Sequence, residues 1–576
     1  MNPSTNQLVL WVVTVYFVLL VAIGWLFSRH TGTSASYYRG GNVIPWWAVG
    51  LSQYMASFSA YSFVVIAGVI YSKGIFGLLW TLLAPLSLAL GALLFARRWR
   101  RTGLTTPIEY FLVRFSPRFR QVFAWLGLIS RPLGNGIRMA AFGILITALL
   151  GFDRNTLLVA GLSVPDAVVI GGVVVVIIYT LLGGLFGAVV ADILQFVILQ
   201  AALIPLFVIS YLRVGGWDGL VRSVPAQFMQ LPAVASPDWL WFIGWAVIFF
   251  CDYNAGQWGL ITRYLGTRSE RDAEKAGLLS AVLYLPLSLL ALLPILAARA
   301  LNPEIHPESS FGWISREVLP GGLVAAMVAA MFSATLSTIS AELNTLAGVF
   351  AIDIYQARIN PGAPEARVVV VGRLATFVAG AAMIAVGLLV LHGAGLVLNA
   401  AQQVASFFVI PMAVPMLLGL FTWRVDSRGA FAAMLAGAIA AAVFYYLPRN
   451  LGCTPGAIAL WQNAGTAAVS VLVFYGSRLA FRADDARRAA ARTLVESLAV
   501  PLTAPAAPEG GFPAPLKVVG LCVLFTALIL LTTLIQPASR TQWPAIVATC
   551  GGLIALAVFA LWADRCQRQK TDPLPS

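Results

Sequence analysis

Long runs of apolar residues dominate the chain, and short polar stretches separate them. A run such as VVIGGVVVVIIYTLLGG is apolar on every side, whereas a strand of a membrane barrel alternates apolar and polar positions over about ten residues. A helix needs about twenty consecutive apolar residues to cross a bilayer. The pattern therefore predicts an all-α integral membrane protein with about fifteen spans.

The predicted spans form an N-terminal helix, a block of ten and a C-terminal group of four. They lie near residues 7–28, between about 43 and 423, and near 429–447, 456–481, 516–536 and 543–563. The first run has no basic leader and no small-residue cleavage site. We therefore expect a retained transmembrane helix there and not a signal peptide.

Charged residues are few and gather in the loops between spans, where they predict the topology. Only 10% of the 576 residues are charged, whereas soluble domains carry roughly 25%. Basic loops such as ARRWRRTG, TRYLGTRSERDAEK and SRLAFRADDARRAAAR all fall on one side of the predicted membrane. The positive-inside rule makes that side cytoplasmic. We expect a cell-membrane protein with its N-terminus outside and its C-terminus in the cytoplasm, and we interpret the net charge of +14 as topology and not as nucleic-acid binding.

Motifs of enzymes and of metal centres do not occur. The five cysteines are scattered without a CxxC pair, so neither a metal site nor a disulfide framework is indicated. GxxxxGK[ST], GxSxG and HExxH are missing, which argues against an ATP-driven pump and a hydrolase. The one long polar linker, 483–514, begins as a basic amphipathic stretch and ends rich in Pro and Ala. We expect a non-enzymatic protein of the lipid bilayer, as a monomer or weak oligomer.

Two predicted spans carry more polar side chains than a lipid-facing helix would. They contain SQYMASFSAYS at 52–62 and SATLSTISAELN at 333–344. Ala334, Ser337 and Thr338 share one helix face at i, i+3 and i+4, and a free carbonyl with two hydroxyls suits a small alkali cation better than a transition metal. A helix that breaks in the first stretch would expose carbonyls, which is tolerated at membrane depth where they line a cavity. The alternative is that these hydroxyls bond to their own helix or to a neighbouring one.

Four ordered motifs resemble the sodium:solute symporter family, which includes sodium–glucose, proline and sialic acid transporters. They are YYRGGNVIPWWAVGLSQYMASFSAYSF, YTLLGGLFGAVVADILQ, GQWGLITRYLGTRSERDAEKA and LSTISAELNTLAGVFAIDIY. The resemblance implies a LeuT-like core of two inverted five-helix repeats, 43–213 and 238–423, each opening with a broken helix. The implied divisions are an N-terminal helix and loop (1–34), the core (35–425), two extra helices (426–482), the linker (483–514), and two C-terminal helices with a basic tail (515–576).

The resemblance also implies Na⁺ as the coupling ion. The family's conserved sodium site corresponds to the carbonyls of Met55, Phe58 and Ala334 and the hydroxyls of Ser337 and Thr338. Some relatives hold a second sodium, and Asp192 and Ser340 match that pattern. Ala341 departs from it because it lacks a hydroxyl, so a structural or gating role for Asp192 stays open.

Solute-binding candidates follow from the same resemblance. They are Ser57, Ser59, Ser62, Thr81, Arg138 and Gln402. Sialic acid transporters of the family hold a carboxylate with an arginine of the third core helix, which Arg138 matches, and with hydroxyls of the first. Thr81 replaces a glutamate of the sugar-binding branch and the seventh core helix lacks that branch's lysine, which disfavours a galactose-type site. The implied solute is small, polar and organic, such as a carboxylate or an acidic sugar.

Several acidic positions leave alternatives open. Arg138 and Arg131 lie two turns apart on one predicted span, and a buried guanidinium needs an anionic partner. Asp192, Asp252 or Glu342 would supply one as internal charge compensation. Asp252 and Tyr253 lie where an inner gate is expected, with aromatic packing as the alternative. Glu342 is either functional at membrane depth or paired with an arginine.

Sodium-coupled symport by alternating access is thus the expected function, and two rivals remain. The first is a transporter-like membrane sensor; since the chain ends at QRQKTDPLPS without a kinase, it would need a signalling partner. The second is coupling to protons through Asp192 or Glu342.

Overall fold

The computed structural model describes residues 44–158, 161–393, 396–481 and 485–502, together with residues 9 and 11–18 and scattered positions between 520 and 562. These residues are helical apart from turns and two isolated β-bridges, which confirms the predicted all-α class. The predicted spans near 7–28, 516–536 and 543–563 lie largely outside the described residues.

The helices follow one another with short connections. In chain order they are α3 (Trp46–Ser57), α4 (Ala67–Lys73), α5 (Ile75–Thr81), α6 (Leu83–Gly91), α7 (Arg97–Arg101), α8 (Phe111–Arg114), α9 (Pro117–Leu150), α10 (Val164–Arg213), α11 (Gly216–Ser223), α12 (Pro237–Cys251), α13 (Trp258–Leu265), α14 (Glu270–Leu292), α15 (Pro294–Leu301), α16 (Ser310–Val318), α17 (Gly321–Gly348), α18 (Glu365–Leu391), α19 (Val397–Val404), α20 (Ile410–Leu418), α21 (Ser427–Asn450), α22 (Pro455–Leu460), α23 (Thr466–Ala480) and α24 (Asp485–Ser497).

Short π-helical turns join several of these helices into longer rods. They are Ser62–Ile66, Ala92–Ala96, Asp252–Gly256, Val349–Ile359, Ala405–Val409 and Trp461–Gly465. Such turns are frequent at functional sites.

Many of the rods are long and apolar enough to cross a membrane. Within the described residues nine pass this test, and a tenth is added if the bent pair Trp46–Ser57 and Ser62–Lys73 counts as one span. Helices suit this setting because they satisfy their own backbone hydrogen bonds. The protein is therefore a multi-pass membrane protein, and the full number of about fifteen spans stays a prediction.

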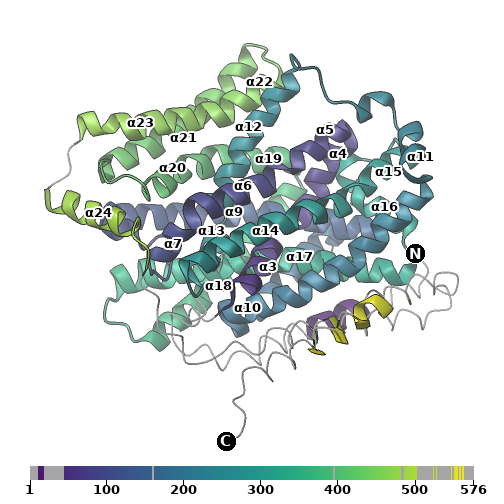
Figure 1. Ribbon diagram of the computed structural model, residues 1–576, viewed down its shortest axis with the longest axis horizontal. Helices are drawn as coiled ribbons and strands as arrows, with labels where there is room; N and C mark the ends of the chain where they lie inside the picture. The colour runs from purple at the N-terminus through teal and green to yellow at the C-terminus, as the bar shows by residue number, and fades with distance from the viewer. Residues whose placement is uncertain are drawn as a thin grey trace, which may run out of the picture.

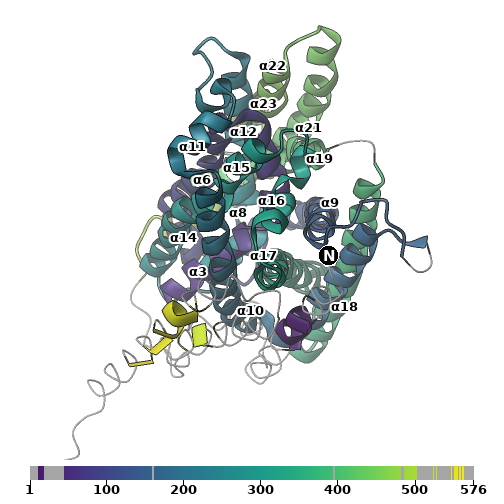
Figure 2. The same cartoon turned by 90° about the vertical axis from the view of Figure 1, so that its right-hand side faces the viewer.

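α17 forms the centre of the bundle. It packs against α3, α9, α10 and α18, and Figure 2 shows it among α9, α10 and α18. Of its most apolar window, 94% is buried, whereas the corresponding value for α18 is 28%. The hydroxyl-rich stretch 333–344 thus lies in the protein interior, where its polar groups face other helices and not lipid.

Three helices that follow residue 426, namely α21, α22 and α23, lie on one side of this core. α21 and α23 pack against each other and against α20, and α22 packs against α12; Figure 1 shows this group in green along one edge of the bundle. α24 then packs against α8. The group α21–α23 and the separate helix α24 therefore both pack on the outside of the core.

Candidate ion and solute sites

The first helix break fastens α3 to the centre of α17. The two halves of the broken rod are bent by 57°, and Phe58 between them has an extended backbone, with φ −116° and ψ 120°. The Ala60 N–H donates to Thr335 Oγ1 on α17 at 3.1 Å. The backbone groups at the break have thus left the helical pattern, as the sequence predicted from the polar stretch 52–62.

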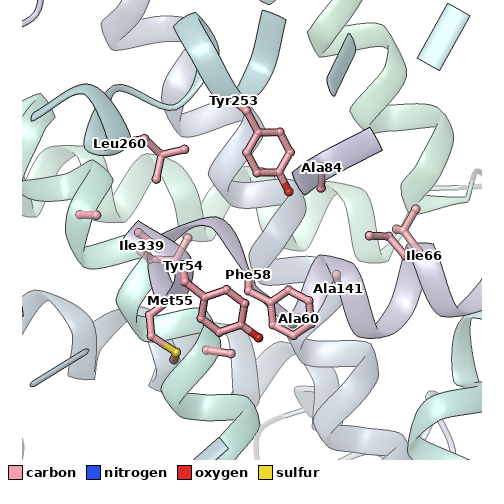
Figure 3. Close-up of a cluster of buried hydrophobic side chains, with 14 of the residues drawn as sticks. Tyr54, Met55, Phe58, Ala60, Ile66, Ala84, Ala141, Tyr253, Leu260 and Ile339 are labelled. Carbon is pink, nitrogen blue, oxygen red and sulfur yellow. The ribbon is translucent and has the colours of Figure 1, made fainter. Parts of the chain in front are cut away.

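The predicted sodium ligands meet at this junction. Thr338 Oγ1 lies 3.4 Å from the carbonyl oxygen of Phe58 and 3.3 Å from that of Ala334. The carbonyl oxygen of Met55 is 3.4 Å from the Phe58 N–H, and its residue borders the same break (Figure 3). The Thr338 hydroxyl therefore reaches one carbonyl oxygen of the break and one of α17.

Ser337 adds a buried hydroxyl beside this group. Its side chain is fully buried, and its oxygen has no hydrogen bond of normal distance among the described residues, although the Asp192 carboxylate is near enough to interact with it. A buried polar group without a partner costs about 1–3 kcal/mol, and a bound cation would remove that cost. Carbonyl and hydroxyl oxygens are hard, neutral ligands that suit an alkali ion, and within the described residues no group of three His, Cys, Asp or Glu side chains could hold another metal. The residues thus fit Na⁺, and the exact ligand set stays a prediction.

Asp192 on α10 lies next to this junction and pairs with Arg263 on α13. Their Oδ2 and Nη2 atoms are 2.9 Å apart, and neither side chain is more than 1% exposed. Ser52 links them, since its hydroxyl accepts from Arg263 Nε at 2.7 Å and donates to Asp192. Asp192 Oδ1 has no hydrogen-bond partner in the described part of the chain. A second sodium at Asp192 and Ser340 stays a prediction, and Arg263 already neutralises the carboxylate that would bind it.

A cavity of about 830 Å³, including its opening to solvent, lies between α3, α9, α12 and α19. Its lining includes most of the predicted solute and gate residues, namely Ser57, Ser59, Ser62, Arg138, Asp252 and Tyr253. Aromatic and aliphatic side chains form the rest of its wall. An apolar cavity with a few converging polar groups is the usual form of a small-molecule site.

Arg138 and Asp252 form an ion pair that faces this cavity. Arg138 Nη2 lies 3.2 Å from Asp252 Oδ2, and the two side chains are 15% and 24% exposed. Arg138 Nη1 also donates to Asn135 Oδ1 at 2.8 Å, and Gln257 Nε2 donates to Asp252 Oδ2 at 2.7 Å. Of the three partners that the sequence left open for Arg138, Asp252 is the one in direct contact.

Arg131 and Glu342 form a second, more buried set of opposite charges. The Arg131 guanidinium lies 5.6 Å from the centre of the Trp258 ring, a favourable cation–π distance. Glu342 Oε1 accepts from the Gly259 N–H at 2.8 Å. The two charges attract each other electrostatically, while Arg131 Nε and Glu342 Oε2 have no hydrogen-bond partner among the described residues. The pairing interpretation of Glu342 fits this arrangement.

Tyr253 connects the second helix break to the first. Its hydroxyl donates to the carbonyl of Ser57 at 3.3 Å and is 3.1 Å from the hydroxyl of Tyr284. Figure 3 shows the ring above Phe58 with its hydroxyl directed at the first break. Tyr253 therefore lies where a gating residue would contact both broken helices, although its gating role stays a prediction.

Thr81 and Gln402 differ from the other solute candidates in their contacts. Thr81 Oγ1 donates to the carbonyl of Leu78 at 2.7 Å, and Gln402 Nε2 donates to Gln462 Oε1 on the neighbouring rod at 3.4 Å. Neither belongs to the cavity lining. We therefore leave them out of the proposed solute site.

Sequence reasoning missed three residues that the structure brings to these sites. Arg263 stands in the motif GQWGLITRYLGTRSERDAEKA, and the sequence pattern assigned it to the basic loop TRYLGTRSERDAEK. Gln257 and Asn135 orient the Arg138–Asp252 pair. Asn135 lies three residues before Arg138, a spacing that brings side chains together on a helix, so its contact had a local signal. Gln257 lies five residues after Asp252, a spacing that an α-helix does not bring together, and it reaches Asp252 because Asp252–Gly256 is a π-helical turn.

One family model matches more than half of the chain, and the curated relatives and a solved structure are sodium-coupled symporters. The model described as "Sodium:solute symporter family" matches residues 37–234 and 277–437. The sodium/glucose cotransporter of Vibrio parahaemolyticus is 25% identical over 482 residues, which are 76% of this chain and 85% of the relative. The sodium/sialic acid symporter NanT of Aliivibrio fischeri is 28% identical over 447 residues, 73% of this chain and 84% of the relative. A solved Na⁺-coupled sialic acid symporter in a substrate-bound, outward-open state shares the fold, with TM-score 0.66 and 21% identity over 82% of this chain and 98% of its own.

Proposed function

Because the chain belongs to the sodium:solute symporter family, we propose that it takes up a small polar organic solute that carries a carboxylate, together with sodium. Its relatives are transporters and not enzymes, and Na⁺ is the coupling ion of the family. The fold is LeuT-like, as the sequence predicted. The inverted repeats 43–213 and 238–423 and the outside N-terminus belong to the proposal.

The observation that carries the proposal is the hydroxyl of Thr338 between two carbonyl oxygens from different helices. Phe58 on the first break and Ala334 on α17 lie 3.4 and 3.3 Å from it. A sodium ion held by these oxygens, with Met55 and Ser337, would tie the broken helix to α17. The state that binds sodium would thus also be the state in which the adjoining cavity is shaped for solute.

Alternating access would follow when this tie is lost. Movement of α17 away from the first break would separate the ligands and release the ion on the other side. A ligand shifts a conformational equilibrium only by its difference in affinity for the two states. Sodium therefore drives the cycle because the assembled site exists in one state and not in the other.

The driving force sets a limit on what one sodium accomplishes. One positive charge moving inward through about 100 mV releases about 2.3 kcal/mol, and a tenfold sodium gradient adds about 1.4 kcal/mol. Together they would support about a 500-fold gradient of a solute without net charge. A monoanion would cancel the voltage contribution and would be concentrated only about tenfold.

Arg138 would bind the solute carboxylate, with Ser57, Ser59 and Ser62 as hydroxyl partners. Its guanidinium faces the cavity, and arginine matches the planar geometry of a carboxylate. Replacing Arg138 by Lys would keep the charge but lose this match. An unchanged apparent affinity for every transported carboxylate would remove Arg138 from the solute site.

Counterflow in proteoliposomes tests the proposal against its rivals. Vesicles loaded with unlabelled solute should take up labelled solute when sodium is present on both sides. A sensor would bind solute without exchanging it. Exchange that continues unchanged after sodium is replaced by choline, but depends on pH, would instead support proton coupling through Glu342 or Asp192.

A further inference from the structure

The charges around the cavity balance one another. Arg138 faces Asp252 at 3.2 Å, and the more buried Arg131 is attracted to Glu342. Two guanidiniums therefore meet two carboxylates, and neither arginine supplies a surplus positive charge. A cavity that binds a simple anion is expected to keep an excess of positive charge, because an anion that is buried without a counterion is costly away from water.

Asp252 has unused capacity to accept hydrogen bonds. Both of its contacts, from Arg138 and from Gln257, end on Oδ2. An ionised carboxylate offers about four acceptor positions, so the other oxygen remains available in the described part of the chain. Gly256 lies directly against that oxygen, since a Cβ there would be 2.3 Å from Oδ1. Any side chain at 256 would cover it.

The surrounding wall suits a cationic group near Asp252. Tyr61, Phe249 and Tyr253 line the same cavity, and the last two rings are stacked with centroids 5.9 Å apart. Aromatic faces attract ammonium groups. Asp252 follows Phe249 by three residues, so the carboxylate and the rings extend from neighbouring positions of the same rod.

We infer that the transported solute is a zwitterion, whose carboxylate binds Arg138 and whose protonated amine binds Asp252. This inference rests on the proposed function and narrows its solute class. A zwitterion replaces both partners of the resident ion pair at once, so each charge keeps a counterion. A solute with a carboxylate alone would draw Arg138 away and leave Asp252 without one, which is costly at low exposure.

The driving force agrees with this class. A zwitterion has no net charge, so its uptake with one sodium retains the full voltage contribution and the limit of about 500-fold. The Asp192–Arg263 pair already neutralises the carboxylate that a second sodium would need. One sodium and a net-neutral solute are therefore mutually consistent.

The test compares matched compounds on the purified full-length protein. Alanine, proline, leucine and phenylalanine are each measured beside their N-acetyl derivative, which is an anion, and their amide, which is a cation. Sialic acid and glucose complete the panel. Binding is followed by thermal shift with sodium and with choline, because a ligand that binds the folded state raises the midpoint of unfolding. At least one zwitterion should bind with sodium about tenfold or more tightly than its two derivatives, given the loss of one charge-assisted hydrogen bond.

Asp252→Asn tests the residue itself. The variant keeps the size of the side chain and its hydrogen bond from Gln257 but removes the charge. It should weaken binding of the zwitterion about tenfold to hundredfold and reverse the preference toward the N-acetyl anion. Asp353→Asn is the matched control, because Asp353 is a fully buried aspartate paired with Arg120 at 2.6 Å outside the cavity. It should leave the preference between compounds unchanged.

The outcomes distinguish failure of the zwitterion inference from failure of the proposed sodium symport. Sodium-dependent binding of an N-acetyl anion or of sialic acid, with no zwitterion preferred, overturns the zwitterion inference and leaves sodium symport intact. A zwitterion preference that survives Asp252→Asn also overturns it. If no compound of any charge binds more tightly with sodium than with choline, the proposed function fails as well.

Discussion

Replacing Thr338 by valine removes the hydroxyl that joins the two halves of the predicted sodium site. The change conserves volume at a position that is 2% exposed, so it leaves no cavity. The hydroxyl lies 3.4 Å from the Phe58 oxygen and 3.3 Å from the Ala334 oxygen. Without sodium the loss is about one ordinary hydrogen bond, near 1 kcal/mol.

With sodium the loss is larger, because a ligand of a charged ion is removed. Interactions with a charged group contribute about 1.5–3 kcal/mol, which corresponds to about a tenfold to hundredfold weaker sodium affinity. Ser337→Ala should weaken sodium binding similarly. It should lower sodium-free stability little, since the only polar neighbour that acts on the Ser337 hydroxyl is the carboxylate of Asp192 and no hydrogen bond between them is within normal distance in the described residues.

The assay is a sodium titration of the thermal midpoint at constant ionic strength, with choline as the replacement cation. Thr376→Val is the matched control: Thr376 is 1% exposed and its hydroxyl donates to the carbonyl of Gly372 at 3.1 Å on α18, away from the site. A sodium affinity of Thr338→Val within twofold of the wild type would refute the assignment. So would an equal loss in Thr376→Val.

Three further changes test other parts of the structure. Arg263→Gln leaves Asp192 buried without its counterion and should cost about 3–5 kcal/mol of unfolding free energy; in chemical denaturation, the double variant with Asp192→Asn should lose clearly less than the sum of the single losses. Burial raises the pKa of the Glu308 carboxyl above its ordinary value. The folded protein therefore binds this proton at higher pH than the unfolded chain does. As pH falls from neutrality toward 4.5, the thermal midpoint of the wild type should rise relative to that of Glu308→Gln. A midpoint difference that is constant with pH would contradict this. Gly127→Ala places a Cβ 1.8 Å from the Trp258 ring and should destabilise by about 1–3 kcal/mol, whereas Gly476→Ala, with open space around it, should have little effect on the midpoint.

Much of the architecture was accessible from the sequence because the bilayer constrains it strongly. Long apolar runs permit little except helices, so the all-helical class followed directly. The polar run 52–62 predicted an interior, cavity-lining segment because hydroxyl side chains are poorly suited to a lipid-facing surface. Such a segment is where a helix break is tolerated at membrane depth. The structure has that break at Phe58, where the backbone is extended.

Side-chain pairing was much less accessible. Asp192 and Arg263 are 71 residues apart, and nothing local in the sequence indicates that they meet. Arg138 had three plausible acidic partners, and only packing brings Asp252 to 3.2 Å. The hydrogen bond from Gln402 to Gln462 was equally hidden, because a motif fixes where a residue stands along a helix but not which neighbour its side chain contacts; a role of Gln402 in solute binding stays a prediction.

Accumulation driven by a sodium gradient tests the central claim most directly. Proteoliposomes containing the full-length protein receive a tenfold inward sodium gradient and an inside-negative potential of about 100 mV, and the final ratio of internal to external solute is measured. For one sodium and a net-neutral solute, the ratio should exceed unity with a ceiling of about 500-fold, and it should collapse to unity in Ser337→Ala/Thr338→Val at sodium concentrations that saturate the wild type. Equal accumulation after choline replaces sodium, or in the double variant, would contradict the account.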